Sequence, residues 1–183
     1  KAGDTIRFYE INEKVVWLAR KYFTFLEDCP AECHIAMGAA RLSMENELED
    51  GKPQRFDVLL IDAFSSDAIP THLLTREAVE IYLAHMQPDG ILAVHISNRH
   101  FDLKPVVAAL SAEHGLASCE VCAEGNLRGE ANSDWVLLCR EPEVFQNDVF
   151  REFPSLDGGR QVLWTDVHCS ILTILKKFRL GEI

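Results

Sequence analysis

Two aspartates near the middle of the chain stand where an apolar run gives way to a polar loop. The stretch "LLIDAFSSDAIP", residues 59 to 70, holds Asp62 at the end of the run and Asp67 five positions later. A carboxylate beside apolar neighbours suits a general base toward an amine, and a second carboxylate next to it suits a cationic substrate. The structural alternative is that Asp62 caps a turn and Asp67 forms an Asx turn before Pro70. The spacing alone leaves both interpretations open.

Three other places carry side chains suited to ligand binding. Glu10 ends the strand-like "TIRFYE", where a carboxylate either accepts the two hydroxyls of a ribose or is an acid favoured at a helix N-terminus. His95 in "AVHISN" is expected to be a buried histidine with satisfied hydrogen bonds, with a site residue as the alternative. Trp164 and Asp166 in "VLWTD" pair an aromatic ring with a carboxylate, which suits a cationic aliphatic ligand. A core tryptophan explains Trp164 equally well.

The cysteines do not indicate a metal site. Cys29 and Cys33 form one close pair, and Cys119 and Cys122 form the other. A structural zinc site needs four ligands, and residues three apart on the strand-like "LASCEVCA" point to opposite faces. We therefore expect reduced thiols and no metal. The sequence also lacks a P-loop, a nucleophile elbow and an HExxH motif.

Length and charge narrow the class of protein. The 183 residues fit one domain with a core. The net charge of −11 argues against nucleic acid as a partner and is compatible with a cationic ligand. The alternative is an ordinary acidic protein whose surface charge is unrelated to its ligand. The sequence has no apolar run of the ~20 residues that a membrane span needs and no signal-peptide core at its N-terminus. A cytoplasmic location is the expectation.

Strand and helix patterns alternate along the chain, which predicts an α/β fold with a parallel sheet and helices on both faces. An antiparallel strand is expected at one edge of the sheet, and the strand at 55–64, apolar on both faces, is expected to be central. Ligands of such sheets lie beyond the carboxyl ends of the strands, where Asp62 stands. The predicted strands are 4–11, 32–38, 55–64, 90–97, 116–123 and 134–141, and the predicted helices are 12–26, 75–86, 102–115, 143–153 and 169–178, with a helical turn at 41–51.

Several of these segments together resemble the spermidine synthase-like family. The likeness rests on "GDTIRFYEIN", "GAARLSME", "FDVLLIDAFSSDAIPTHLLTREAVEIYLAHMQPDGILAVHISNRHFDLKPVV", "SDWVLLCREPE" and "VLWTD", which cover nearly the whole chain. It is closest to bacterial members whose soluble aminopropyltransferase-like domain is often fused to a membrane region. The resemblance implies a Rossmann-like, S-adenosylmethionine-dependent methyltransferase fold in a single domain over residues 1–183.

The resemblance also implies an activity and roles for particular residues. The true synthases transfer an aminopropyl group from decarboxylated S-adenosylmethionine to putrescine, and the reaction needs no metal. Asp62 would help deprotonate the attacking amine and border the cofactor, and Asp67 would bind the diamine. Glu10 would bind the ribose, and Gly38, Ala39 and Ala40 would lie along the adenine. The candidate substrate-binding residues are Asp67, Tyr82, Trp164 and Asp166.

The sequence departs from the family pattern in four places. The Gly-rich strand and loop expected before "GDTIRFYEIN" are absent, so we expect an N-terminally truncated domain that lacks a central strand between 4–11 and 55–64. The family's Gly-Asp-Ala reads Gly38-Ala39-Ala40. The spacing from Asp62 to Asp67 is two residues longer than in true synthases, and Val167-His168 follows "WTD" where the fused relatives usually carry a second aspartate.

Three hypotheses about function follow from the sequence. The first is an aminopropyltransferase-like domain whose substrate is a small polyamine and whose catalytic activity in this chain is poor or absent. The second is a non-catalytic binding or dimerisation module derived from the same fold, because a strand edge left open by the absent strand favours a homodimer. The third is an S-adenosylmethionine-dependent methyltransferase acting on a small amine.

Overall fold

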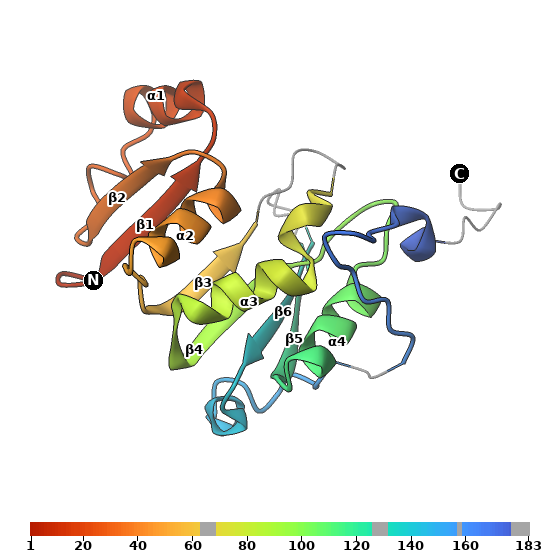
Figure 1. The fold of residues 1–183 in the computed structure, drawn as a ribbon. Coiled ribbons are helices and arrows are strands. Elements are labelled where there is room, and N and C mark those ends of the chain that lie inside the picture. The colour runs from red at the N-terminus through yellow and green to blue at the C-terminus, as the bar shows by residue number, and fades with distance from the viewer. Residues whose placement is uncertain (63–68, 126–131, 157–158, 177–183) are drawn as a thin grey trace. The chain divides into compact units, whose positions relative to one another are not determined.

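The computed structural model describes residues 1–62, 69–125, 132–156 and 159–176. The chain divides into two compact units, Lys1–Pro53 and Gln54–Ile183. The first unit is a parallel pair of strands with two helices (Figure 1). Its elements are β1 (Thr5–Glu10), α1 (Glu13–Tyr22), β2 (Glu32–Met37) and α2 (Ala40–Glu49). The predicted strands at 4–11 and 32–38 are thereby confirmed.

A polar network fastens α2 to β1 within the first unit. The Tyr9 hydroxyl donates a 2.7 Å hydrogen bond to Glu47 Oε2, and the Arg7 guanidinium pairs with Oε1 of the same carboxylate. Arg7 Nε also donates to the Tyr9 hydroxyl at 3.1 Å. Burial and the Glu47 carboxylate raise the pKa of Tyr9 above its ordinary value. The neutral phenol therefore remains a hydrogen-bond donor across the physiological range.

Helix α1 is shorter than predicted and buries little. Its N-cap is Asn12, whose side chain accepts a 3.0 Å hydrogen bond from Lys14 N. The helix ends at Tyr22 because Phe23 takes an extended conformation, with φ −126° and ψ 146°, rather than continuing to residue 26. None of its residues is buried. By contrast, the helical turn predicted at 41–51 is the full ten-residue helix α2.

The second unit is a four-stranded mixed sheet with α3 and α4 on one face (Figure 1). The strand order is β3-β4-β6-β5, with β3 parallel to β4 and β6 antiparallel to both of its neighbours. The α/β class is confirmed. Its elements are β3 (Phe56–Ile61), η1 (Thr71–Leu73), α3 (Arg76–Ala84), β4 (Met86–His95), α4 (Lys104–Glu113), β5 (Ala117–Ala123), β6 (Ser133–Cys139), η2 (Pro142–Gln146) and η3 (Ile171–Ile174).

The core of this unit lies between the sheet and its two helices. Leu92 and Val94 of β4 pair with Leu138 and Val136 of β6, and all four side chains are buried. Helix α4 supplies an uninterrupted buried run from Val106 to Ser111. Burial of each valine or leucine side chain in this layer contributes ~1.5–3 kcal/mol to folding. This rigid layer fixes the strand ends at which the candidate site lies.

Two details of the predicted sheet are wrong. The antiparallel strand is not at the edge, because β6 returns by a hairpin into the position between β4 and β5 and leaves β5 outermost. β3 is not covered on both faces either. Leu59 and Ile61 are 6% and 8% exposed, whereas Val58 and Leu60, which point the other way, are each 57% exposed. Among the described residues of the second unit, helices cover only one face of β3, and β3 pairs only with β4.

The described strands form two separate sheets, and no described strand joins β1 to β3. The two closing helices predicted at 143–153 and 169–178 are also wrong for the described residues, since only the short 3₁₀ helices η2 and η3 form there. η3 stops before Leu175, which becomes extended and bridges to Phe101. In the part of the chain that the structure describes, no helix combines the length and apolarity of a membrane span.

Candidate active site

The first part of the candidate site is a carboxylate–histidine pair at the carboxyl ends of β3 and β4. Asp62 follows Ile61, which is opposite Val94 in the parallel register, so Asp62 and His95 are neighbours across the two strands. His95 Nδ1 lies 2.8 Å from Asp62 Oδ1. The Asp62 side chain is 48% exposed and that of His95 is 20% exposed. The pair is thus anchored in the sheet but open to a ligand.

The His95 ring is held by its neighbour on β6. His95 is opposite Trp135 in the antiparallel ladder, and the two rings stack with centroids 4.7 Å apart and planes 26° apart. Trp135 is held in turn, because its indole Nε1 donates a 2.7 Å hydrogen bond to Ser133 Oγ. His95 was expected to be a satisfied buried histidine; it is instead a partly exposed partner of Asp62. Two titratable residues at the ends of adjacent parallel strands are the sequence signal that points to such a pair.

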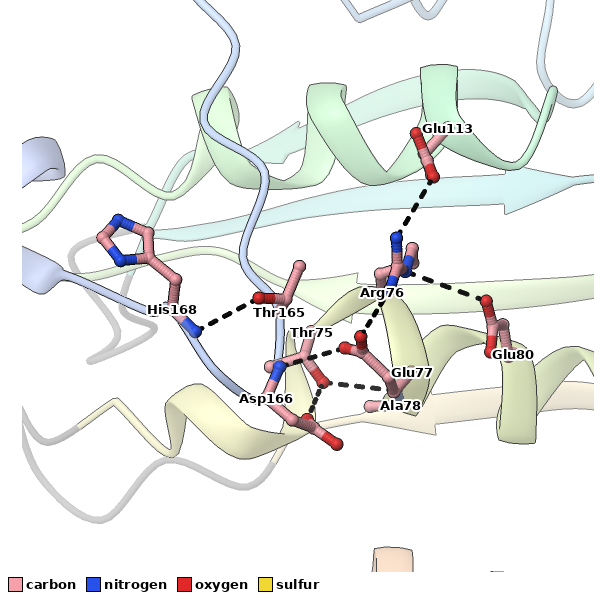
Figure 2. Close-up of polar contacts among 9 residues, drawn as sticks. All are labelled: Thr75, Arg76, Glu77, Ala78, Glu80, Glu113, Thr165, Asp166 and His168. Atoms are coloured by element: carbon pink, nitrogen blue, oxygen red, sulfur yellow. Dashed lines mark hydrogen bonds and ion pairs between the residues drawn. The ribbon is translucent and has the colours of Figure 1, made fainter.

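The second part is the segment Trp164–Asp166, which is clamped to the first turn of α3 (Figure 2). Thr75, the N-cap of α3, accepts from Ala78 N at 3.2 Å and donates from Oγ1 to Asp166 Oδ1 at 2.8 Å. Asp166 N donates to Glu77 Oε2 at 3.0 Å, and Arg76 N donates to Trp164 O at 2.9 Å. The Asp166 carboxylate therefore lies at the N-terminus of α3.

An ion cluster around Arg76 sets the charge beside Asp166 (Figure 2). The Arg76 guanidinium lies 2.8 Å from Glu77, 3.9 Å from Glu80 and 3.9 Å from Glu113. The backbone N–H of Glu77 itself, that of Asp166 and the Arg76 guanidinium all donate to the Glu77 carboxylate and lower its pKa. Glu77 is therefore an ionised structural acceptor, committed to holding the Asp166 backbone.

Two predicted substrate-binding side chains are core residues. Tyr82 is 1% exposed, and its hydroxyl donates to Leu73 O at 3.1 Å. Trp164 is fully buried, and its indole Nε1 has no hydrogen-bond partner among the described residues. Neither ring presents a face to solvent in this structure. Their contact with a substrate stays a prediction, and the predicted diamine ligand Asp67 lies outside the described residues.

The predicted cofactor residues of the first unit are adjacent to one another. Glu10 ends β1, and Gly38 follows β2 and donates from its backbone N to Glu10 O at 2.9 Å. Glu10 Oε1 accepts from Asn12 N at 2.7 Å, which fixes the carboxylate at the strand end. Gly38 has φ +140°, and a Cβ on it would lie 3.0 Å from Ser43 Oγ, so only glycine fits this turn without a shift. Contact of these residues with a cofactor stays a prediction.

The described cysteines and acids are not arranged for metal binding. No group of three or more His, Cys, Asp or Glu side chains suited to a metal occurs in the described ranges. Cys119 is buried and Cys122 is exposed, as expected for residues on opposite faces of β5. Partial desolvation of the thiol by its neighbours, together with hydrogen bonds to Asp134 and Glu120, raises the pKa of Cys122 to about 11. Cys122 is therefore a weak nucleophile at neutral pH.

Comparison with known proteins shows the fold. No protein-family model and no curated protein matches the sequence. The spermidine synthase of Thermotoga maritima aligns at a TM-score of 0.58 with 15% identity over 78% of this chain and 48% of its own. A spermidine synthase in complex with the transition-state analogue AdoDATO aligns at a TM-score of 0.58 with 15% identity. This alignment covers 78% of this chain and 49% of the synthase chain. The chain has a spermidine synthase-like fold and spans about half the length of these structures.

Proposed function

We propose that this chain is a spermidine synthase-like transferase domain that moves an aminopropyl group from decarboxylated S-adenosylmethionine to a diamine such as putrescine. One observation carries the proposal. Asp62 stands at the carboxyl end of β3 in a spermidine synthase-like fold, half exposed and bonded to His95. In open parallel sheets this edge binds the ligand, so the position suits a reacting carboxylate.

The chain's residues supply what amine alkylation requires. An ammonium group must lose a proton before its nitrogen becomes a nucleophile, and an exposed carboxylate at the site accepts it. Decarboxylated S-adenosylmethionine supplies the electrophilic carbon next to a sulfonium. Asp62 is the proposed base, and Asp67 and Asp166 are the proposed ligands of the cationic diamine. The net charge of −11 favours the approach of a polycation.

The first unit supplies the proposed nucleoside site. Glu10 is the proposed acceptor of the ribose hydroxyls, and the backbone of Gly38, Ala39 and Ala40 is the proposed adenine contact. The support is local: the Glu10 carboxylate is fixed by Asn12 N, and Gly38, at the end of the neighbouring strand, donates from its backbone N to Glu10 O.

The test is turnover by the full chain with putrescine and decarboxylated S-adenosylmethionine, with the product identified by mass spectrometry. Asp62→Asn is expected to lower turnover by about a hundredfold or more, as loss of a general base does. Asp57→Asn, at an exposed position near the start of the same strand, is the matched control and is expected to behave as wild type. Equal turnover of wild type and Asp62→Asn would remove Asp62 from the mechanism.

The donor in the same assay separates the related hypotheses. S-adenosylmethionine in place of its decarboxylated form gives a methylated amine if the domain is a methyltransferase, and the product mass distinguishes the two transfers. Calorimetry with both donors and with methylthioadenosine measures binding directly. No binding of any of the three at millimolar concentration would contradict both transferase hypotheses for this chain.

A second candidate function, an assembly module, rests on a different observation. Val58 and Leu60 are each 57% exposed on β3, whose outer edge has no described strand partner. Such an edge can pair with the same strand of a second copy and form a continuous sheet. Leu60→Lys is expected to convert a homodimer to a monomer in sedimentation velocity. A wild-type chain that is monomeric at high concentration would contradict this function.

A further inference from the structure

We propose that His95 is the positioning residue for Asp62: its Nδ1–H fixes one carboxylate oxygen, Oδ1, so that the other, Oδ2, faces the amine. The inference rests on the proposed function and adds a residue to it. It starts from the 2.8 Å contact between His95 Nδ1 and Asp62 Oδ1. An ionised carboxylate only accepts hydrogen bonds, so the proton of this bond lies on Nδ1.

The geometry makes this contact a fixed element of the sheet rather than a chance surface pair. Asp62 and His95 stand at the ends of two adjacent parallel strands whose register is set by Ile61 opposite Val94. Most exposed ion pairs join two long, mobile side chains and contribute little. Here both side chains are short: His95 is the last residue of β4, and Asp62 directly follows the last residue of β3.

The ring itself is prevented from turning. Its stacking on Trp135, with planes 26° apart, leaves the imidazole edge pointing at Asp62. Trp135 is anchored by the 2.7 Å bond from Nε1 to Ser133 Oγ. A chain of three side chains from β6 to β4 therefore ends on the Asp62 carboxylate. Such a chain serves a site in which the direction of one oxygen matters.

The proton transfer balances without a change in His95. An N–H bond of the substrate ammonium breaks, an O–H bond forms at Asp62 Oδ2, and the electron pair stays on nitrogen. That pair forms the new N–C bond as the C–S bond breaks and its electrons go to sulfur. Asp62 then returns its proton to solvent. His95 keeps its Nδ1 proton throughout, so its contribution is orientation alone.

The role predicts a specific pattern among variants. His95→Ala removes the donor and is expected to lower kcat by about a hundredfold with a much smaller change in KM, because orientation of the base matters most in the transition state. His95→Asn places an amide N–H near the position of Nδ1 and is expected to return kcat to the wild-type range. His34→Asn is the matched control, since His34 pairs with Glu32 at 3.1 Å on the other unit.

A measurement independent of turnover accompanies the kinetics. Nitrogen-15 NMR of histidine in the full chain is expected to show an Nδ1-bound proton for His95 that shifts upfield in Asp62→Asn. Absence of an Nδ1 proton in the folded wild type overturns the proposal even if the His95 variants fold poorly. So does wild-type turnover by His95→Ala, or failure of a folded His95→Asn to recover turnover.

Failure of the inference and failure of the proposed function look different. An active wild type with an equally active His95→Ala leaves aminopropyl transfer standing and removes only the positioning role. A wild type that neither binds nor converts any amine overturns the proposed function, and the positioning role falls with it, whatever the NMR spectrum shows.

Discussion

The two units of the chain use the same kinds of residue and bury them to different degrees. Among the described residues, Ala31 and Met44 are the only buried apolar side chains of the first unit, whereas those of the second unit extend over β3, α3, β4, α4, β5 and β6. Helix α4 buries six consecutive residues, and α1 buries none. An apolar stripe thus predicts a helix, but only a covering layer converts the stripe into a core.

The two units are also stabilised by different kinds of interaction. The second unit has a continuous apolar layer between a sheet and two helices. The first depends on the polar attachment of Glu47 to Arg7 and Tyr9. Apolar burial is proportional to area and cumulative, whereas a hydrogen-bond network contributes only a few kcal/mol in total. We therefore expect the first unit to open more readily.

The largest expected effect is in amide hydrogen exchange of the full chain. Amides of β4 and β6 are expected to exchange at least about a thousandfold more slowly than those of β1 and β2, a gap of ~4 kcal/mol in opening free energy. Mass spectrometry of peptides from the exchanged chain measures both sets in one experiment. Equal protection of the two parallel pairs, β1–β2 and β3–β4, would show that the units open together.

A pair of tryptophan substitutions tests the same contrast by mutation. Trp164 is fully buried in the second unit, and Trp17 is 53% exposed in the first. Trp164→Ala is expected to lower the free energy of unfolding by about 3–5 kcal/mol, and Trp17→Ala by no more than about 0.5 kcal/mol. Urea titrations of the ligand-free chain measure both. Similar losses would mean that Trp17 is covered in solution.

The strands and their carboxyl ends could be predicted from the sequence because period and turn residues are local signals. Asp62 was placed correctly at the end of β3 by its apolar run. The hydrogen bond from Thr75 to Asp166 could not be predicted, because the two residues are 91 positions apart and neither local sequence indicates which distant segment it contacts. The position of β6 between β4 and β5 depends likewise on how a hairpin returns, not on its residues.

Other errors have a common physical cause. The tract at 143–153 has helical periodicity, yet only η2 forms, and it ends where Asn147 becomes extended. The helix predicted at 12–26 likewise ends at Tyr22, because Phe23 takes an extended conformation. In both segments the helical periodicity continues past the residue at which the observed helix ends.

The polar attachment of the first unit can be weakened selectively. Glu47→Gln removes the charge that accepts from both Tyr9 and Arg7, with an expected loss of about 1–3 kcal/mol in the stability of that unit. Glu45→Gln is the control on the same helix, because Glu45 pairs with Arg41 at 3.1 Å and is 37% exposed. Exchange rates of β1 amides report the loss. Equal effects of the two changes would show that the network is not what fastens α2.

The smallest expected effect is a pH dependence in the clamp that holds Asp166. The Glu77 carboxylate accepts hydrogen bonds from the Glu77 backbone N–H, from Asp166 N and from the Arg76 guanidinium, and these bonds lower the pKa of Glu77. A depressed pKa stabilises the fold above the unfolded value of about 4.3, and that stabilisation is lost as the pH falls through the lower, folded value. The free energy of unfolding of wild type is therefore expected to exceed that of Glu77→Gln at neutral pH, by less than about 1 kcal/mol for so open a pair.

In acid this gap is expected to close, because protonated Glu77 and glutamine both lack the charge. Denaturant titrations of the two chains at neutral pH and below pH 4 measure it. Glu80, which lies 3.9 Å from Arg76 and is 60% exposed, provides the control, and Glu80→Gln is expected to show little change at either pH. A gap for Glu77→Gln that persists unchanged in acid would mean that Asp166 N bonds the carboxyl group equally well without its charge. The hydrogen bond from Asp166 N to Glu77 would then hold Asp166 without any contribution from the charge of Glu77.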